Sequence, residues 1–311
     1  MNLKRLIEQY ISFQQSLGVT SIRDAETLRT FSRACGPRAN VANVRIRHVD
    51  AFLGTVRPVT RTWFIKLSLL RGFFRYAVSR GYVAAAPLPI VMPKRPPQFV
   101  PYIYAREELC HLLKVVESSR RKSISLEPVT IRAMILVYYG SGLRLHEAIN
   151  LTCADVDLSR SLLMIRNTKF GKTRLVPVGP QLRQVLVQYD RTRSKHRKAE
   201  APFFATRAGN FVPSDTLQWR FRVLRGRAGI RRTDTHQQPR IHDLRHTFAV
   251  HRLTAWYQQG ADVQRLLYHL SVYLGHARLQ DTQVYLSMTP ELLHEASKRF
   301  EHYAGKGRCH V

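Results

Sequence analysis

The stretch "RIHDLRHTFAVH", residues 240–251, mixes polar and apolar side chains at helical spacing. His242 and Arg245 are three residues apart, so on a helix they project to the same side. Phe248 and Leu253 supply an apolar side that can be buried. By itself this pattern favours a structural helix, but it is also suited to a helix that presents a His–Arg pair to a phosphate.

A metal site is the third interpretation of this stretch. His242 and His246 are four residues apart, which is a zinc-ligand spacing. The metalloprotease pattern, however, requires Glu directly after the first His, and Asp243 stands there. No further segment with ligand spacing follows, so the sequence disfavours a metal.

Three other segments carry candidate polar groups. In "YGSGLRLHEAINL", residues 139–151, Arg144 follows a glycine turn at the start of a new helix, where backbone N–H groups favour an anion; it could equally be a surface partner of Glu147. In "YLGHARLQDTQVYLSM", residues 273–288, the candidates are His276 and Tyr285, although a tyrosine in an apolar helix is most often a core residue.

Residues 161–179, "SLLMIRNTKFGKTRLVPVG", alternate in hydropathy on either side of a polar turn, which predicts a β-hairpin. Lys169, Lys172 and Arg174 would put three cations at its tip, as a DNA groove requires, although solvated turns are usually polar. Residues 202–213, "PFFATRAGNFVP", predict a second, shorter hairpin.

The charge balance is the strongest global signal. Fifty Lys and Arg against 21 Asp and Glu give a formal charge of +29 in 311 residues. Such an excess opposes compaction and indicates a polyanionic partner, DNA or RNA first, over general basicity. The four cysteines form no CxxC pair, and we find no signal peptide or membrane-spanning segment, so we expect a cytoplasmic protein.

The chain is long enough for two domains. Residues 1–86 predict a helical unit, and its strongest helix is 59–80. The core stripe of this helix is Leu67, Leu70, Phe74 and Ala77. Arg71 and Arg75 lie on another face, where they could be solvated or could contact phosphates. Six prolines in 87–101 predict an extended linker, 87–105. Residues 106–311 form the second domain, with helices near 106–116, 128–139, from 145 and from 214, and a last helix at 289–304. The fold class is mainly α with small β-hairpins.

Together these segments provide two arginines, a lysine, two histidines and a tyrosine in one domain of a strongly basic chain. That set is suited to phosphoryl transfer on DNA without a metal. Arginine forks hold the phosphate oxygens, a histidine handles the nucleophile's proton, a lysine protonates the leaving oxygen and a tyrosine forms a covalent phosphoester.

In the order and spacing of these segments, residues 106–290 resemble the tyrosine recombinase (phage integrase) family, with a Xer-like character. "GSGLRLHEAINLTCADVDL" resembles its first box, "IRNTKFGKTRLVPVG" its lysine hairpin, "HDLRHTFAVH" its second box, and "YLGH" and "TQVYL" its last two motifs. The segment between "HRL" and "LGH" is longer than usual and resembles recombinases that are encoded in adjacent groups on transposons.

The resemblance implies a site-specific recombinase that clamps duplex DNA between two domains in the shape of a C and works as a tetramer on two DNA sites. Tyr285 would form a 3′-phosphotyrosine, Arg144 and Arg245 would hold the phosphate, His242 would assist proton movement, Lys169 would protonate the 5′ oxygen and His276 would bind a nonbridging oxygen. No metal or nucleotide cofactor is implied. The biological reaction would be integration, excision or transposition of a mobile element, with or without related recombinases as partners.

Three rival functions stay open at the level of sequence: a DNA-binding protein with this fold but no catalysis, a type IB topoisomerase, and a metal-dependent nuclease that uses His242 and His246. The last helix could dock on a neighbouring protomer or pack on its own domain.

Overall fold

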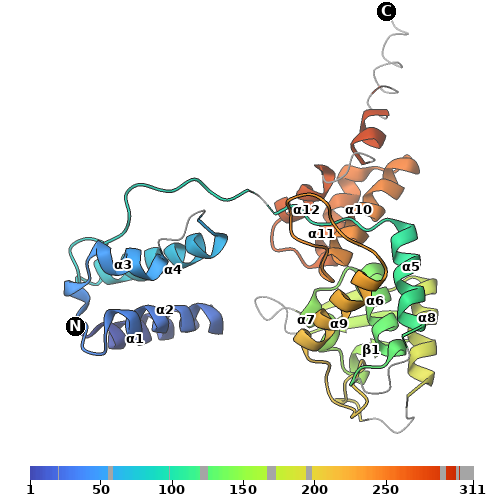
Figure 1. Cartoon of the computed structure of the whole chain (residues 1–311), viewed down its shortest axis with the longest axis horizontal. Coiled ribbons are helices and arrows are strands. Elements are labelled where there is room, and N and C mark those ends of the chain that lie inside the picture. Colours follow the sequence, from blue (N-terminus) through green and yellow to red (C-terminus); the bar gives the residue numbers. More distant parts are fainter. Residues whose placement is uncertain are drawn as a thin grey trace, which may run out of the picture. The chain divides into compact units, whose positions relative to one another are not determined.

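The computed structural model describes residues 1–19, 21–54, 59–97, 99–119, 125–166, 173–193, 198–287, 292–298 and 301. The chain divides into two compact units, residues 1–98 and 99–311 (Figure 1). The fold is mainly helical with one small sheet, as predicted. None of the helices in the described residues has the length and hydropathy needed to cross a bilayer.

The first unit is a helical bundle. Its elements are α1 (Leu3–Ser16), α2 (Ile22–Cys35), η1 (Val41–Asn43), α3 (Ile46–Leu53) and α4 (Arg61–Ser79). The side chains of Asn2 and Ser21 cap the first two helices by accepting backbone N–H groups. Its core contains Phe31 and Phe73 together with the four stripe residues predicted on α4, all buried.

The described residues between α4 and α5 form no helix or strand, in keeping with the prolines there. The second unit begins at residue 99, earlier than the predicted start at 106. The reason is Tyr104, which is fully buried in this unit. Its backbone N–H donates to Thr247 Oγ1 (3.0 Å) and its hydroxyl to the Arg240 carbonyl (3.1 Å).

The second unit surrounds a central helix, α6. Its elements are α5 (Arg106–Glu117), α6 (Pro128–Ser141), α7 (Leu145–Ile149), η2 (Cys153–Asp155), β1 (Val156–Asp157), β2 (Leu162–Ile165), β3 (Arg174–Pro177), α8 (Pro180–Arg191), α9 (Ser214–Arg227), α10 (Asp243–Gln258), α11 (Val263–Leu274), α12 (Gln280–Gln283) and η3 (Val284–Ser287). α6 packs against α5, α8 and α10. Gly142, in the left-handed region at φ +60°, ends it at the predicted turn.

The sheet has the antiparallel order β1-β2-β3, and the register pairs Leu163 with Val176 and Ile165 with Arg174. The strands of the first predicted hairpin are therefore confirmed. The second predicted hairpin is present only as one antiparallel bridge without strands: Ala205 pairs with Phe211 across a turn in which the Thr206 backbone N–H donates to the Asn210 carbonyl. At its start, Pro202 bridges to Thr152. α8 was not predicted from the sequence.

The long segment between "HRL" and "LGH" forms the end of α10 and most of α11, joined by a turn at Gly260 (φ +69°). Residues 292–298 are helical, within the predicted last helix, and the remainder of 288–311 lies outside the described residues apart from 301. Leu292 is fully buried in the same apolar cluster as Phe248 and Leu253. This end of the helix therefore packs on its own domain.

Candidate active site

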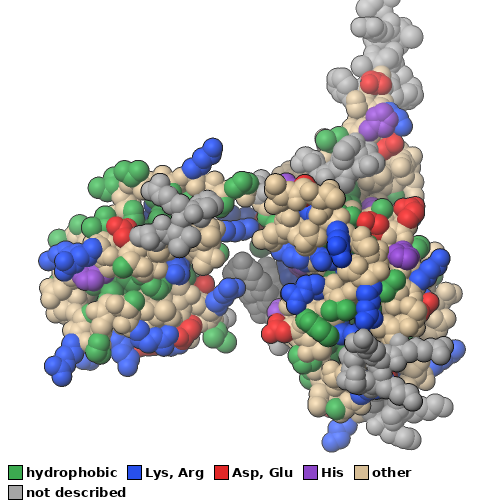
Figure 2. Space-filling model, viewed as in Figure 1, with side chains coloured by type: hydrophobic (Ala, Val, Ile, Leu, Met, Phe, Trp, Pro, Cys, Tyr) green, Lys and Arg blue, Asp and Glu red, His purple; other side chains and the backbone are tan. Residues whose placement is uncertain are grey.

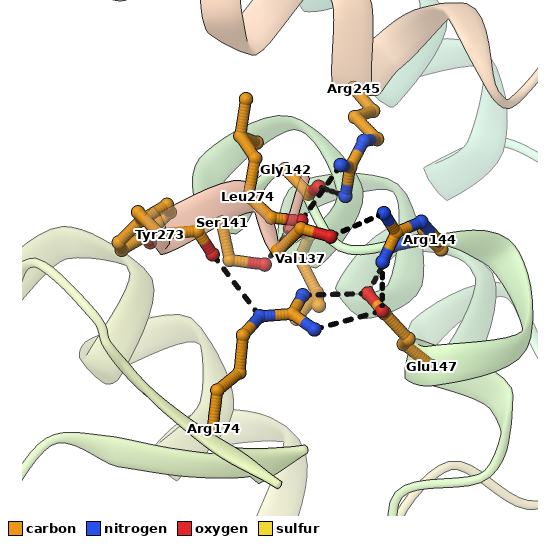
Figure 3. Close-up of polar contacts among 10 residues, drawn as sticks. Val137, Ser141, Gly142, Arg144, Glu147, Arg174, Arg245, Tyr273 and Leu274 are labelled. Atoms are coloured by element: carbon orange, nitrogen blue, oxygen red, sulfur yellow. Dashed lines mark hydrogen bonds and ion pairs between the residues drawn. The ribbon is translucent and has the colours of Figure 1, made fainter. Parts of the chain in front are cut away.

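The two arginines of the predicted motifs meet at a set of backbone carbonyls, although they lie about a hundred residues apart (Figure 3). Arg245 Nη1 donates to the Gly142 carbonyl (2.6 Å) and its Nη2 to the Leu274 carbonyl (2.8 Å). Arg144 Nη2 donates to the Gly275 carbonyl (2.6 Å). The glycine turn after α6 and the end of α11 thereby hold both guanidinium groups in one place.

Burial distinguishes these two arginines. Arg245 is 3% exposed, and burial lowers its pKa to about 10, although Tyr285 acts to raise it. Arg245 therefore remains charged at neutral pH. The Arg144 side chain is 33% exposed and can meet a ligand from solvent. One arginine is therefore a fixed interior cation and the other a more accessible one.

Glu147 was considered in the sequence only as a surface partner of Arg144, but the structure buries it between two arginines. Arg144 Nη1 donates to Oε1 (2.8 Å), and the backbone N–H of Arg144 donates to Oε2 (2.8 Å). Arg174 binds both carboxylate oxygens at 2.9 and 2.8 Å. Burial alone would raise the pKa of Glu147, but these hydrogen bonds lower it to about 2.

Arg174 does not lie at a hairpin tip as predicted. It begins β3, its side chain is 14% exposed, and it is fully engaged with Glu147 and the Tyr273 carbonyl (3.2 Å). Strand pairing with Ile165 directs the Arg174 side chain into the domain. The contact of Arg174 with a DNA groove stays a prediction. Lys169 and Lys172 lie outside the described residues.

Tyr285 lies on η3 and is 3% exposed. Two histidine rings pack against it: His246 with centroids 5.6 Å apart, and His276 stacked at 6.1 Å. Burial raises the pKa of the Tyr285 hydroxyl, whereas the charge of Arg245 and a hydrogen bond from it act in the opposite direction. The hydroxyl thus lies within reach of the buried arginine.

Three histidines lie at the site and are neutral at physiological pH: His246 and His276 contact Tyr285, and His242 contacts His246. Burial, followed by nearby positive groups, lowers the pKa of His242 to about 4 and those of His246 and His276 to about 3. His276 Nδ1 and Thr282 Oγ1 are hydrogen-bonded at 2.7 Å. A neutral imidazole can accept a proton, which is what a tyrosine nucleophile requires of its neighbours.

His246, considered in the sequence only as a metal ligand with His242, contacts two proposed site residues. Its ring packs edge to face on His242 at 5.2 Å and also contacts Tyr285. Its Nδ1 is buried and has no hydrogen-bond partner among the described residues. The same described part of the chain contains no group of three or more His, Cys, Asp or Glu side chains placed to hold a metal.

Sequence comparison agrees with this arrangement. The model of the phage integrase family matches residues 105–291, more than half of the chain. The chain belongs to the phage integrase family. It is 39% identical over 245 residues to "Putative integrase/recombinase y4rB" of Sinorhizobium fredii, covering 77% of this chain and 78% of that protein. It is 30% identical to tyrosine recombinase XerA of Thermococcus onnurineus, covering 74% and 72% of the two chains.

Solved structures of integrases share the fold of this family member. A lambda integrase dimer bound to a core site superposes with a TM-score of 0.66 at 17% identity, covering 90% of this chain and 96% of that one. The Tn1549 transposon integrase gives 0.66 at 16%, covering 95% and 99%. Family membership and relatives named tyrosine recombinases make this protein a tyrosine site-specific recombinase.

Proposed function

We propose that the protein breaks and rejoins duplex DNA at specific sites through a covalent 3′-phosphotyrosine at Tyr285. The observation that carries the proposal is the convergence of Arg144, Arg245 and Tyr285, from three separate segments, on one site lined with neutral histidines. The +29 charge supports DNA as the partner, and Figure 2 displays Lys and Arg side chains over both units.

The proposed chemistry balances without a metal or cofactor. Tyr285 Oη attacks the scissile phosphorus as the bond from phosphorus to the 5′ oxygen breaks, and its proton passes to a neutral imidazole, which we assign to His242. Lys169 donates a proton to the leaving 5′ oxygen. Arg144 and Arg245 neutralise the nonbridging oxygens, and His276 hydrogen-bonds one of them. Attack by a partner strand's 5′ hydroxyl reverses the step.

We further propose that the active assembly is a homotetramer on two DNA sites, serving integration, excision or transposition of a mobile element in the cytoplasm. A lambda integrase tetramer bound to a Holliday junction shares the fold, with a TM-score of 0.67 at 15% identity, which supports this proposal. Exposed Arg71 and Arg75 on α4, together with Lys172, are proposed phosphate contacts.

The test is covalent trapping on a nicked suicide duplex that carries the recombination site, itself found by footprinting the DNA that flanks the gene. We expect the wild type to form a protein–DNA adduct in EDTA and Tyr285→Phe to form none while still binding the duplex. An adduct with Tyr285→Phe would refute the assignment of the nucleophile. Efficient relaxation of plasmids that lack the site would instead favour a topoisomerase.

A further inference from the structure

Arg174 joins the β-sheet to both elements that carry the arginine site (Figure 3). Its Nη1 and Nη2 bind the two carboxylate oxygens of Glu147 at the start of α7. Its Nε donates to the carbonyl of Tyr273 near the end of α11. All three kinds of guanidinium nitrogen are therefore used within the protein, a geometry that lysine cannot reproduce.

The Glu147 carboxylate is shared between Arg174 and Arg144. Arg144 Nη1 and Arg174 Nη1 both bind Oε1, at 2.8 and 2.9 Å. Arg144 in turn extends its Nη2 to the Gly275 carbonyl. Because one carboxylate balances two guanidinium groups, Arg144 keeps positive charge that is not neutralised by Glu147 and can act on a phosphate.

Gly275 shows how closely Arg174 approaches the α11 turn. A Cβ built at this glycine would lie 2.8 Å from Arg174 Nη1 and 2.9 Å from its Cζ. The residue also has φ +68°, which favours glycine. The guanidinium plane thus lies against the backbone that precedes His276, and any side chain at position 275 would displace it.

We propose that Arg174 is a positioning residue for strand cleavage, which holds Arg144, through Glu147, and the Gly275 turn in the geometry that binds the scissile phosphate. The inference rests on the proposed function. In this role Arg174 acts through Glu147 and the Gly275 turn, and not through a DNA contact of its own. It also ties β3, which begins at Arg174, to Arg144.

The experiment compares Arg174→Ala and Arg174→Lys with the wild type on two nicked suicide duplexes. One has a normal scissile phosphate, and in the other a methyl group replaces one nonbridging oxygen, so the transition state carries less negative charge. Arg183→Ala is the matched control, because Arg183 also binds a backbone carbonyl near the sheet, that of Leu158 (2.7 Å), but contacts none of the site arginines.

We expect Arg174→Ala to slow single-turnover cleavage of the phosphate about 10- to 100-fold, with DNA affinity unchanged, because a phosphate-binding donor is misplaced. On the methylphosphonate the deficit should shrink to within about threefold of the wild type, since less charge needs neutralising. Arg174→Lys should recover part of the rate, and Arg183→Ala should match the wild type on both duplexes.

An equal deficit on both duplexes would reduce Arg174 to a structural role and overturn the proposal, and so would loss of DNA affinity with the cleavage rate intact. If Arg174→Ala lacks a cooperative melting transition, Arg174→Lys provides the same comparison of the two duplexes. A wild-type protein that forms no adduct would refute the proposed function, whereas an adduct formed equally well by Arg174→Ala refutes this inference alone.

Discussion

The two halves of the active site are held by different forces. In the arginine half, Arg144, Arg174 and Arg245 donate to Glu147 and to four backbone carbonyls at 2.6–3.2 Å. In the tyrosine half, Tyr285 contacts His246 and His276 mainly through ring faces, on a four-residue 3₁₀ turn. Charged hydrogen bonds fix the orientation of a guanidinium group, whereas ring packing restricts the orientation of a side chain less.

The difference indicates a division of labour. The proposed phosphate-binding groups are held in place by hydrogen bonds within the protein, so under the proposed mechanism they need no rearrangement when negative charge develops in the transition state. Tyr285, the proposed nucleophile, is 3% exposed, and burial raises the pKa of its hydroxyl although the charge of Arg245 acts in the opposite direction. Changes in the arginine half should therefore alter the rate strongly, and changes around the tyrosine should alter the dependence on pH.

The largest effect is expected from Arg245→Ala. It removes the buried donor to Gly142 and Leu274 and one phosphate-binding group, so cleavage should fall by at least about 100- to 1000-fold. Two buried carbonyls lose their donor, which should cost about 1–3 kcal/mol of unfolding free energy. Single-turnover trapping and denaturant unfolding measure the two effects.

Arg132→Ala, which breaks an exposed pair with Glu117, is the control and should change neither the cleavage rate nor the stability. Cleavage within tenfold of the wild type would show that the arginine half is not the dominant one.

An intermediate effect is expected from Gly142→Ala, which disturbs the carbonyl that Arg245 binds. A Cβ there would lie 2.6 Å from Phe248 Cδ1 and 2.7 Å from Leu274 Cδ2, at φ +60°. Backbone strain of about 1–2 kcal/mol and overpacking of about 1–3 kcal/mol should lower the unfolding free energy together. Gly209→Ala shares the positive φ (+82°) but meets nothing within 4 Å, so it should show the strain alone. Equal losses in the two variants, measured by denaturant unfolding, would contradict the close packing of the turn.

The smallest effect is expected from pH on the tyrosine half. The folded chain binds protons at His242, His246 and His276 only near pH 3–4, whereas the unfolded chain binds them near the ordinary value of 6.5. Between these values the unfolded state holds more protons, so the unfolding free energy falls as pH falls. The loss should be about 1 kcal/mol per histidine from pH 6.5 to 5.5.

His246→Phe tests this expectation, because it keeps a ring beside Tyr285 but cannot titrate. Compared with the wild type by denaturant unfolding at several pH values, it should lose less stability on acidification. Glu147 contributes little in this window, since its pKa lies at about 2 in the folded chain and its ordinary value is 4.5. An identical pH slope in the two proteins would mean that His246 titrates normally in the folded chain.

Much of the fold could be predicted because its signals are local. The stripe on α4, the break at Gly142 and the alternation in 161–179 each depend on residues close together in the chain, and all three are confirmed. The second hairpin did not form strands because alternation does not ensure strand pairing, and within residues 202–213 only Ala205 and Phe211 bridge. Tyr104 was assigned to the linker because contacts far along the chain, with Thr247 on α10 and Phe221 on α9, place it in the second unit.

The sequence by itself determined the family, since the order and spacing of motifs survive without coordinates, together with the basic charge and the mainly helical class. Only the tertiary structure decided the partners of those motifs. It buried Glu147 between two arginines, turned Arg174 inward and brought His246 against Tyr285. The physical reason is that a side chain's partners and its burial depend on which distant segments pack beside it, and desolvation and ion pairing, which set the charge of these groups, follow from that packing.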